Sequence, residues 1–361
     1  MKRTTQKPAY LVLYEQLRTE IVSGARPFGS QLPSRRVQSR ERNLSAVTVN
    51  HSYELLCEEG YIESRPQSGY YVIYRENDGF FPPARSGSFR PPQSAPADRD
   101  GFPFSVLART MRRVLAEYGE SLLTRTPGIG ADALREALSR YLGRCRRLQV
   151  APDQIIIGAG AEYLYGLVVE LLGRDRVFGL EDPSYQKIRL IYEAKGISCR
   201  MLPMDGEGIR LNALRTTDAS VLHITPYRSF PTGVTASASR RHEYLRWVGQ
   251  GDRYLVEDDY ESEFSLLRKA EEPLLCAAEG NNVLYMNTFS RTVSPSLRAG
   301  YLVLPQPLMR SFQERLGFYS CSVPAFEQYV LAELLDSGEL EKHINRVRRN
   351  ERKSEKGETG R

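Results

Sequence analysis

A proline-rich stretch divides this chain of 361 residues and limits what it can fold into. Residues 75–103 contain the pairs Pro82–Pro83 and Pro91–Pro92, several glycines and serines, and few aliphatic side chains. Proline fixes φ and lacks an amide N–H, so such a segment cannot continue a helix or a central strand. We expect an extended linker here, with one domain at 8–74 and a second at 104–349.

The composition of the chain excludes several classes of protein. The five cysteines are scattered and form no CxxC pair, so we expect neither a disulfide framework nor a metal site. No apolar run is long enough for a signal sequence or a transmembrane helix, which favours a soluble, cytoplasmic protein. The net charge of +6 permits a polyanionic partner. Only eight of the 50 basic residues are lysines, which limits the available amine chemistry.

Short apolar segments alternate with helical patterns from Phe104 onward. This alternation is typical of an α/β architecture around a mainly parallel sheet. The predicted strands are Gln154–Gly158, Arg176–Leu180, Ala219–Thr225, Tyr254–Glu257, Val283–Met286 and Gly300–Leu304. The tail at 350–361 contains no aliphatic or aromatic side chain, so we expect it to be disordered.

The block at 8–74 has the pattern of three helices followed by a hairpin. Apolar residues recur along one face of a first helix, and Ser34 and Ser45 are placed to cap a second and a third. Two alternating segments, 61–63 and 70–73, flank a turn and predict two strands. The stretches LPSRR and LSAVTVNHSYELLCEEGYIESRPQSGYYV, in this order of elements, resemble the GntR-type winged helix-turn-helix.

This resemblance implies a partner, double-stranded DNA with an operator sequence. In such domains the N-terminal residues of the recognition helix read base edges, while arginines and the wing hold phosphates. On this mapping the residues that face DNA are Arg36, Ser45, Ala46, Thr48, His51, Arg65 and Gly69. The alternative is a small helical domain that binds another protein.

Two positions of the second helix depart from the family pattern. Gln38 and Arg42 stand where the family normally has leucines. Each lost leucine would cost about 2–5 kcal/mol. The helix is therefore weakened unless both stems lie along the apolar surface with their polar heads in water.

Five motifs of the second block occur in a fixed order: IIIGAGAEYLYGLVVELLG, LEDPSYQKI, ITPYRSFPTG, YLVEDDYESEF and NVLYMNTFSRTVSPSLRAGYLVLP. In the first motif, Gly158 and Gly160 let the backbone approach a ligand, and the following helix offers N–H groups to a phosphate. Alone, this pattern also fits a plain tight turn. Together the five motifs resemble the aminotransferase-like domain of the MocR subfamily of GntR regulators, from about Phe104 to Arg349.

The second resemblance implies the fold of type I aminotransferases with pyridoxal 5'-phosphate (PLP) as cofactor. Asp258 would pair with the pyridine nitrogen, Tyr260 would lie near the phenolic oxygen, and Tyr185 would stack on the ring. The phosphate would be held by Gly158, Ala159, Gly160, Ala161 and Arg298. For Asp258 and Tyr260 the alternative is that they merely cap a strand end.

Arg291 stands at the position of the cofactor lysine. The family's TFSK reads TFSR here, and no lysine occurs between Lys269 and Lys342. A guanidinium cannot form a Schiff base, so we expect no working aminotransferase and at most non-covalent PLP. The TPSHQ that usually precedes FPTG is also changed, and Tyr227 and Arg228 could fill or recharge the pocket.

Three functions remain open at this point. The first is a homodimeric DNA-binding regulator whose body dimerises or senses a small-molecule effector. The second is a PLP-dependent enzyme with a vestigial head. The third is a truncated, inactive product, because the family continues past the position of Arg349 with a further subdomain, whose loss would leave an apolar surface exposed.

Overall fold

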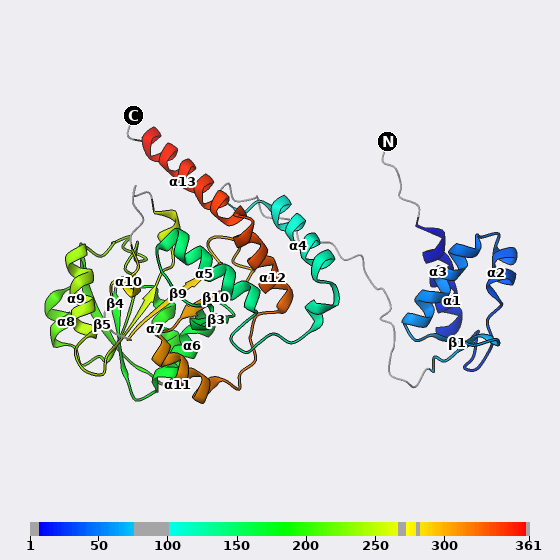
Figure 1. Cartoon of the computed structure of the whole chain (residues 1–361), viewed down its shortest axis with the longest axis horizontal. Coiled ribbons are helices and arrows are strands. Elements are labelled where there is room, and N and C mark those ends of the chain that lie inside the picture. Colours follow the sequence, from blue (N-terminus) through cyan, green and yellow to red (C-terminus); the bar gives the residue numbers. More distant parts are fainter. Residues whose placement is uncertain (1–6, 76–100, 266–271, 279–281, 359–361) are drawn as a thin grey trace. The chain divides into compact units, whose positions relative to one another are not determined.

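The computed structural model describes residues 7–75, 101–265, 272–278 and 282–358 (Figure 1). The chain divides into two compact units, Met1–Ser94 and Ala95–Arg361. Most of the predicted linker, 76–100, lies outside the described residues. Within the described part of the chain, no helix is both long and apolar enough to cross a membrane.

The N-terminal unit consists of three helices and a hairpin: α1 (Ala9–Val22), α2 (Arg35–Arg42), α3 (Ala46–Glu58), β1 (Ile62–Arg65) and β2 (Gly69–Val72). β1 pairs with β2 in antiparallel register, with Ile62 opposite Val72. The predicted apolar face of α1 packs against α3, and Leu17 and Tyr53 are fully buried in the shared core. The predicted order of three helices and a wing is confirmed.

Two serines determine where α2 and α3 begin. Ser34 Oγ accepts a hydrogen bond from the Val37 amide at 3.3 Å, and Ser45 Oγ accepts one from the Thr48 amide at 3.1 Å. Such caps satisfy N–H groups that have no partner within the helix. Both caps form at the serines that the sequence indicates.

The two unusual positions of α2 behave differently. The Arg42 guanidinium stays at the surface, 3.4 Å from Glu20 Oε1. Gln38 is only 1% exposed, and among the described residues neither Oε1 nor Nε2 of its amide has a hydrogen-bond partner. The condition that both polar heads reach water is therefore met at Arg42 and not at Gln38. The Ser34 cap and the packing of α2 on α3 set the rotation of α2, which turns Val37 outward and Gln38 into the core.

The C-terminal unit is built on an eight-stranded sheet with the order β3-β10-β9-β8-β7-β4-β5-β6. Neighbours from β9 to β5 pair in parallel, whereas β10 is antiparallel to both β3 and β9, and β6 is antiparallel to β5. The sheet is therefore mixed and mainly parallel, as predicted. Its strands are β3 (Ile155–Gly158), β4 (Val177–Asp182), β5 (Ser198–Asp205), β6 (Gly208–Ile209), β7 (Val221–Ile224), β8 (Tyr254–Asp258), β9 (Val283–Thr288) and β10 (Gly300–Val303).

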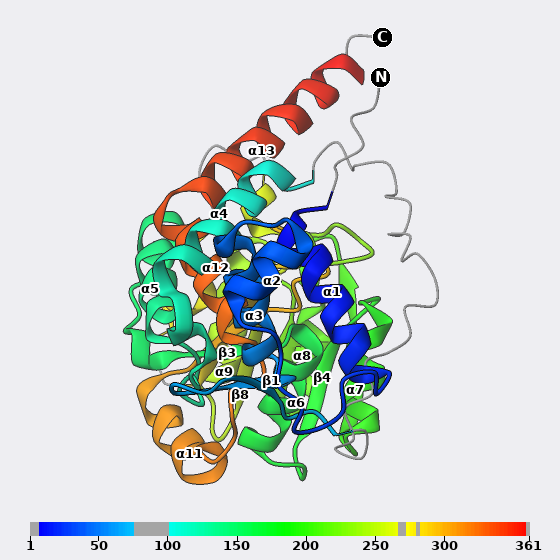
Figure 2. The ribbon, with the colours of Figure 1, turned by 90° about the vertical axis from the view of Figure 1, so that its right-hand side faces the viewer.

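Helices cover both faces of this sheet (Figures 1 and 2). They are α4 (Phe104–Tyr118), α5 (Asp132–Arg146), α6 (Ala161–Leu172), α7 (Gln186–Ala194), α8 (Leu211–Thr216), α9 (Ala238–Val248), α10 (Leu274–Ala277), α11 (Gln306–Leu316), α12 (Ala325–Asp336) and α13 (Glu339–Glu358), with short 3₁₀ turns η2 (Gly119–Leu123), η3 (Pro152–Gln154) and η4 (Ser262–Phe264). On one face α6, α7 and α11 pack on Leu284 and Leu302. On the other face α4, α5, α12 and α13 pack on Tyr301, and α8 to α10 pack on Leu255. Alternate strand residues thus serve opposite faces of a three-layer α/β domain.

The end of the chain differs from the prediction of a disordered tail at 350–361. Helix α13 continues to Glu358, and only 359–361 lie outside the described residues. Leu340, Ile344 and Val347 are buried and anchor the first turns of this helix. The following glutamates, lysines and arginines are good helix formers, so an anchored helix extends through a segment without apolar side chains.

Candidate functional site

The exposed side of α3 carries most of the predicted DNA contacts. Among the described residues, the predicted contacts on α2 and α3 are all exposed or half-exposed: Arg36, Ser45, Ala46, Thr48 and His51. Ser45 and Thr48 share a hydroxyl hydrogen bond of 2.8 Å, which orders the start of α3. The His51 ring stacks on Tyr10 with centroids 4.1 Å apart, so this imidazole has a defined position.

The two predicted wing residues, Arg65 and Gly69, flank the turn between β1 and β2. Gly69 has a φ of +107°, a conformation that glycine adopts without steric cost. The Arg65 guanidinium lies 4.5 Å from the centre of the Tyr71 ring, and its Nε donates to Glu63 Oε1 at 2.7 Å. The wing arginine is therefore held in place while remaining exposed.

Val47 is a candidate contact that the sequence analysis did not single out. It lies in the first turn of α3 and is 78% exposed. An apolar side chain at the start of a recognition helix is suited to the methyl group of thymine. The helical spacing of the sequence predicts that Val47 is exposed, because Val49 and Tyr53 define the buried face of α3 and Val47 lies outside it.

In the C-terminal unit, the predicted cofactor-binding residues gather at one edge of the sheet. Strands β3, β4, β8 and β9 all end at this edge, and β10 begins there, with Gly300 opposite Gly158 and Thr288. The carboxyl edge of such sheets is the usual place for ligands. The edge brings together Gly158 to Ala161 at the end of β3, Tyr185 after β4, Asp258 and Tyr260 at the end of β8, and Arg291 and Arg298 between β9 and β10.

One end of this site is a cradle between Gly160 and Arg298. Gly160 has a φ of +81° and precedes α6 without any side-chain cap. A Cβ atom at this glycine would lie 3.5 Å from the Arg298 guanidinium carbon, so the glycine leaves room beside that cation. Glu162 Oε1 lies 3.5 Å from Arg298 and also contacts the Lys187 ammonium. Lys187 was not predicted, although it lies within the LEDPSYQKI motif, because its contact with Glu162 depends on the packing of α7 beside α6.

Asp258 lies in the middle of the site and is held by buried aromatic side chains. Tyr165 Oη donates to Asp258 Oδ2 at 2.6 Å. Burial and the Asp258 carboxylate raise the pKa of Tyr165 well above its ordinary value, so this phenol remains a donor. His223 Nε2 lies 3.4 Å from the same oxygen, and its Nδ1 hydrogen-bonds to Tyr192 Oη at 2.7 Å. The carboxylate therefore has a fixed orientation.

Tyr185 and Tyr260 place aromatic surface around Asp258. Tyr185 is partly exposed and makes an edge-to-face contact with Phe230, with ring centroids 6.0 Å apart. Burial and the nearby Glu261 raise the pKa of Tyr260, whereas Arg291 acts in the opposite direction. The Tyr260 hydroxyl is therefore within electrostatic reach of the residue at the lysine position.

Arg291 belongs to a cluster of three charged side chains. Its Nε lies 3.4 Å from Glu261 Oε1, and Arg228 Nε lies 3.7 Å from Glu261 Oε2. One carboxylate thus stands between two guanidinium groups, which leaves one net positive charge. We call these residues the Arg228–Glu261–Arg291 cluster. Tyr227, in contrast, is buried, and its hydroxyl donates to the Glu272 carbonyl oxygen.

A buried polar network follows Asp258 along the chain. Asp259 Oδ2 accepts hydrogen bonds from Arg146 Nη2 at 2.7 Å and from Tyr285 Oη at 2.6 Å. Burial, together with the charge of Asp259, raises the pKa of Glu263 to about 7. Arg348 of α13 donates through Nε to the Glu263 carbonyl oxygen at 2.5 Å. The segment that carries Tyr260 and Glu261 is therefore tied to both α5 and α13.

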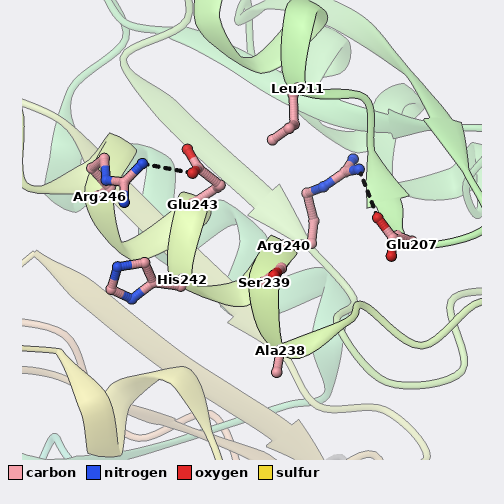
Figure 3. A pocket seen from close by; sticks show the side chains of 8 residues that line it. All are labelled: Glu207, Leu211, Ala238, Ser239, Arg240, His242, Glu243 and Arg246. Carbon is pink, nitrogen blue, oxygen red and sulfur yellow. Dashed lines mark hydrogen bonds and ion pairs between the residues drawn. The ribbon is translucent and has the colours of Figure 1, made fainter.

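A separate pocket of about 500 Å³ lies between α8, α9 and the turn before β6 (Figure 3). Its charged side chains pair with one another: Arg246 Nη1 lies 2.6 Å from Glu243 Oε1, and Arg240 Nη2 lies 3.5 Å from Glu207 Oε2. None of the predicted site residues lines this pocket.

Comparison with known proteins matches both units. Residues 9–72 match the model of bacterial regulatory proteins of the gntR family, and residues 95–356 match that of class I and II aminotransferases. The HTH-type transcriptional regulator YdeL of Bacillus subtilis (strain 168) is 32% identical, over 98% of this chain and 79% of its own length. The probable rhizopine catabolism regulatory protein MocR of Rhizobium meliloti is 27% identical, over 97% and 76%. The chain belongs to the MocR-type regulators of the gntR family.

The body of this MocR-type regulator has the fold of solved aminotransferases. The α-aminoadipate aminotransferase LysN of Thermus thermophilus, solved as a complex with N-(5'-phosphopyridoxyl)-L-leucine, is 27% identical with a TM-score of 0.59. The match covers 69% of the regulator and 64% of the enzyme, so the chain spans less than two thirds of that enzyme's length. The likeness establishes the fold of the body, and activity is a separate question.

The donor set of this MocR-type regulator suits two parts of PLP and not the third. Arg298, the room left by Gly160 and the start of α6 suit a phosphate. The oriented Asp258 carboxylate suits a protonated ring nitrogen. At the position of the cofactor lysine, the guanidinium of Arg291 offers no amine to the aldehyde.

Proposed function

We propose that this regulator binds operator DNA through its winged head, and that its body binds a phosphorylated pyridine ligand reversibly without transferring amino groups. The observation that carries the proposal is the ion pair between Arg291 and Glu261 at the lysine position. A guanidinium stays protonated in proteins. Arg291 therefore serves neither as a nucleophile nor as the base that moves a proton.

The residues of the body can still hold a ligand. PLP, when bound, supplies a protonated pyridine ring that withdraws electrons. Asp258 would accept the hydrogen bond from the ring nitrogen, and Tyr165 keeps that carboxylate in place. Arg298 and Lys187 would face the phosphate, with Glu162 as their counter-ion in the ligand-free state. These contacts need no covalent link, so we expect dialysis to remove the ligand.

We further propose that the regulator acts as a homodimer in the bacterial cytoplasm. A winged head makes few base contacts, and dimers gain specificity by reading two half-sites of one operator. Chromosomal DNA as the target places this work in the cytoplasm. A ligand bound to the body would then act as an effector by changing the geometry of the dimer.

DNA binding can be tested by fluorescence anisotropy, with promoter DNA and random DNA compared between about 50 and 200 mM salt. We expect Arg36→Gln to weaken binding and to lower the salt slope by about one unit, because one phosphate contact is lost. Arg200→Gln is a matched control for charge, since Arg200 pairs with Asp218 on the surface of the body. Equal affinity and equal salt slopes for both DNAs would contradict operator recognition.

The absence of covalent chemistry can be tested with PLP, borohydride and peptide mass spectrometry. We expect no pyridoxyl group at position 291 in the natural chain, and labelling at that position in the Arg291→Lys variant, which restores an amine. Specific labelling of Lys187 at one equivalent would contradict the proposal, because it would reveal a substitute amine.

A further inference from the structure

Within this proposed function, on which the inference rests, we propose a ligand class for the body. The ligand is a phosphopyridoxyl amine that bears a carboxylate, such as a phosphopyridoxyl amino acid, in preference to PLP itself. Arg228 and Arg291 bind the carboxylate, and Arg298 with Lys187 binds the phosphate.

The charges of the site favour a ligand that is anionic at both ends. At the phosphate end, Arg298 and Lys187 share the single carboxylate of Glu162. At the other end, Arg228 and Arg291 share the single carboxylate of Glu261. Each end therefore carries one excess positive charge, and between them the Asp258 carboxyl group accepts a hydrogen bond from Tyr165. An anion–cation–anion ligand complements this pattern.

The Arg228–Glu261–Arg291 cluster also has hydrogen-bond donors to spare. Its two ion pairs measure 3.4 and 3.7 Å, longer than the short contacts of about 2.7–2.9 Å that guanidinium–carboxylate hydrogen bonds reach. Each guanidinium carries five N–H donors in a planar fork that matches a carboxylate. Glu261 thus neutralises part of the charge without using the donors that a ligand carboxylate needs.

The backbone at Arg228 indicates that the position of this arginine is imposed by its surroundings. Its φ is +52°, a left-handed conformation that is unfavourable for a residue with a side chain. The Arg228 amide donates to Thr235 Oγ1 at 3.2 Å, which holds this conformation. Strained residues of this kind are concentrated at ligand-binding positions. Here the strain places a guanidinium opposite that of Arg291, on the other side of Glu261.

Free PLP is a poorer match to this site than its amine conjugates. Its aldehyde is uncharged and would meet the positive cluster without forming either a covalent bond or a charge-assisted hydrogen bond. A conjugate whose amine is already joined to the pyridoxyl carbon needs no lysine. Its carboxylate adds contacts to both arginines, and hydrogen bonds between charged groups are stronger than those between neutral groups.

The test is isothermal titration calorimetry on the full chain with two probes, N-(5'-phosphopyridoxyl)-L-leucine and pyridoxamine 5'-phosphate. Neither probe has an aldehyde, so no lysine can trap it. Both carry the phosphate and the ring, and only the first carries a carboxylate. We expect the leucine conjugate to bind about 10- to 100-fold more tightly than pyridoxamine 5'-phosphate.

Variants identify the residues responsible. Arg291→Gln and Arg228→Gln should each lower the affinity for the conjugate about 10-fold and leave that for pyridoxamine 5'-phosphate unchanged. Arg298→Gln should weaken both probes. Arg174→Gln is the matched control, because Arg174 pairs with Glu170 on the outside of α6 and the following turn. Fluorescence of Trp247 on thermal unfolding verifies that each variant is folded.

Failure of the inference and failure of the proposed function give different results. Equal affinity for both probes, unchanged by Arg291→Gln, would overturn the assignment of the carboxylate while leaving a phosphopyridoxyl site. Absence of binding for both probes would overturn the ligand site itself, and the inference with it. A tenfold or larger preference that survives both arginine substitutions would also overturn it, because the preference would then arise from the leucine side chain.

Discussion

Replacing Gln38 by leucine should stabilise the N-terminal unit. The Gln38 side chain is 1% exposed, and within the part of the chain that the structure describes its amide oxygen and nitrogen both lack hydrogen-bond partners. Leucine has a similar volume, so Gln38→Leu removes two unsatisfied polar atoms without creating a large cavity. The change tests whether the buried amide is a real cost to the head.

The magnitude follows from the desolvation of the amide. An unsatisfied buried polar group costs about 1–3 kcal/mol, which is the stabilisation expected from its removal. Imperfect fit of the branched leucine would reduce this stabilisation by up to about 1.5 kcal/mol. We therefore expect a net stabilisation of about 1–2 kcal/mol, which is large for a unit of this size because whole domains are stable by about 5–15 kcal/mol. Arg42→Leu is the control, since the surface pair of Arg42 with Glu20 contributes only about 0–1 kcal/mol.

Hydrogen exchange of the α1 and α3 amides, measured by mass spectrometry on the full chain, reports this free energy for the head alone. Gln38→Leu should slow exchange from the globally opened head by about 5- to 30-fold, and Arg42→Leu should leave it nearly unchanged. Unchanged or faster exchange in Gln38→Leu would refute the reasoning, because it would mean that the amide finds partners or that leucine does not fit.

Three further predictions concern both units. Burial raises the pKa of Glu181 to about 7, so the body should lose stability as the pH rises from about 4.5 to 7. In thermal unfolding followed by Trp247 fluorescence, Glu181→Gln should make the dependence of stability on pH less steep, and an unchanged dependence would contradict this assignment. Arg146→Met should lower the free energy of unfolding of the body in urea by about 3–5 kcal/mol, because it leaves Asp259 buried without its cation. A decrease of less than about 1 kcal/mol would show that Asp259 is hydrated. Val47→Ser should weaken operator binding by about 1 kcal/mol in anisotropy titrations, with random-sequence DNA as the control; an equal loss on random DNA would rule out a thymine contact.

Local patterns were sufficient to predict most of the fold. The caps at Ser34 and Ser45 and the six predicted strands depend on residues close together in sequence, and all are present. Strand β5 was not predicted, because its side chains are mostly exposed or half-exposed and do not form an apolar run. The tail at 350–361 was predicted to be disordered, whereas α13 continues to Glu358, because the length of this helix depends on tertiary anchoring of its first turns.

The candidate site was only partly predictable for the same reason. Motif positions lead to Asp258, Arg291 and Arg298, which the carboxyl edge of the sheet brings together. Lys187 and Glu261 could not be identified in this way, because their importance lies in pairs with residues far away in the chain. The burial of Gln38 likewise depends on the rotation of α2 against α3, which composition does not specify.

The hydrogen bond from Arg348 to the Glu263 carbonyl oxygen couples α13 to the segment that carries Glu261. Glu263 is the second residue after Glu261, a distance of at most about 7 Å along the chain. A ligand that moves Glu261 away from Arg228 and Arg291 would therefore also shift the carbonyl group to which Arg348 of α13 is bound. The ten residues of α13 beyond Arg348 extend about 15 Å, so a tilt of about 10° would move the C-terminal end of the helix by about 2.6 Å.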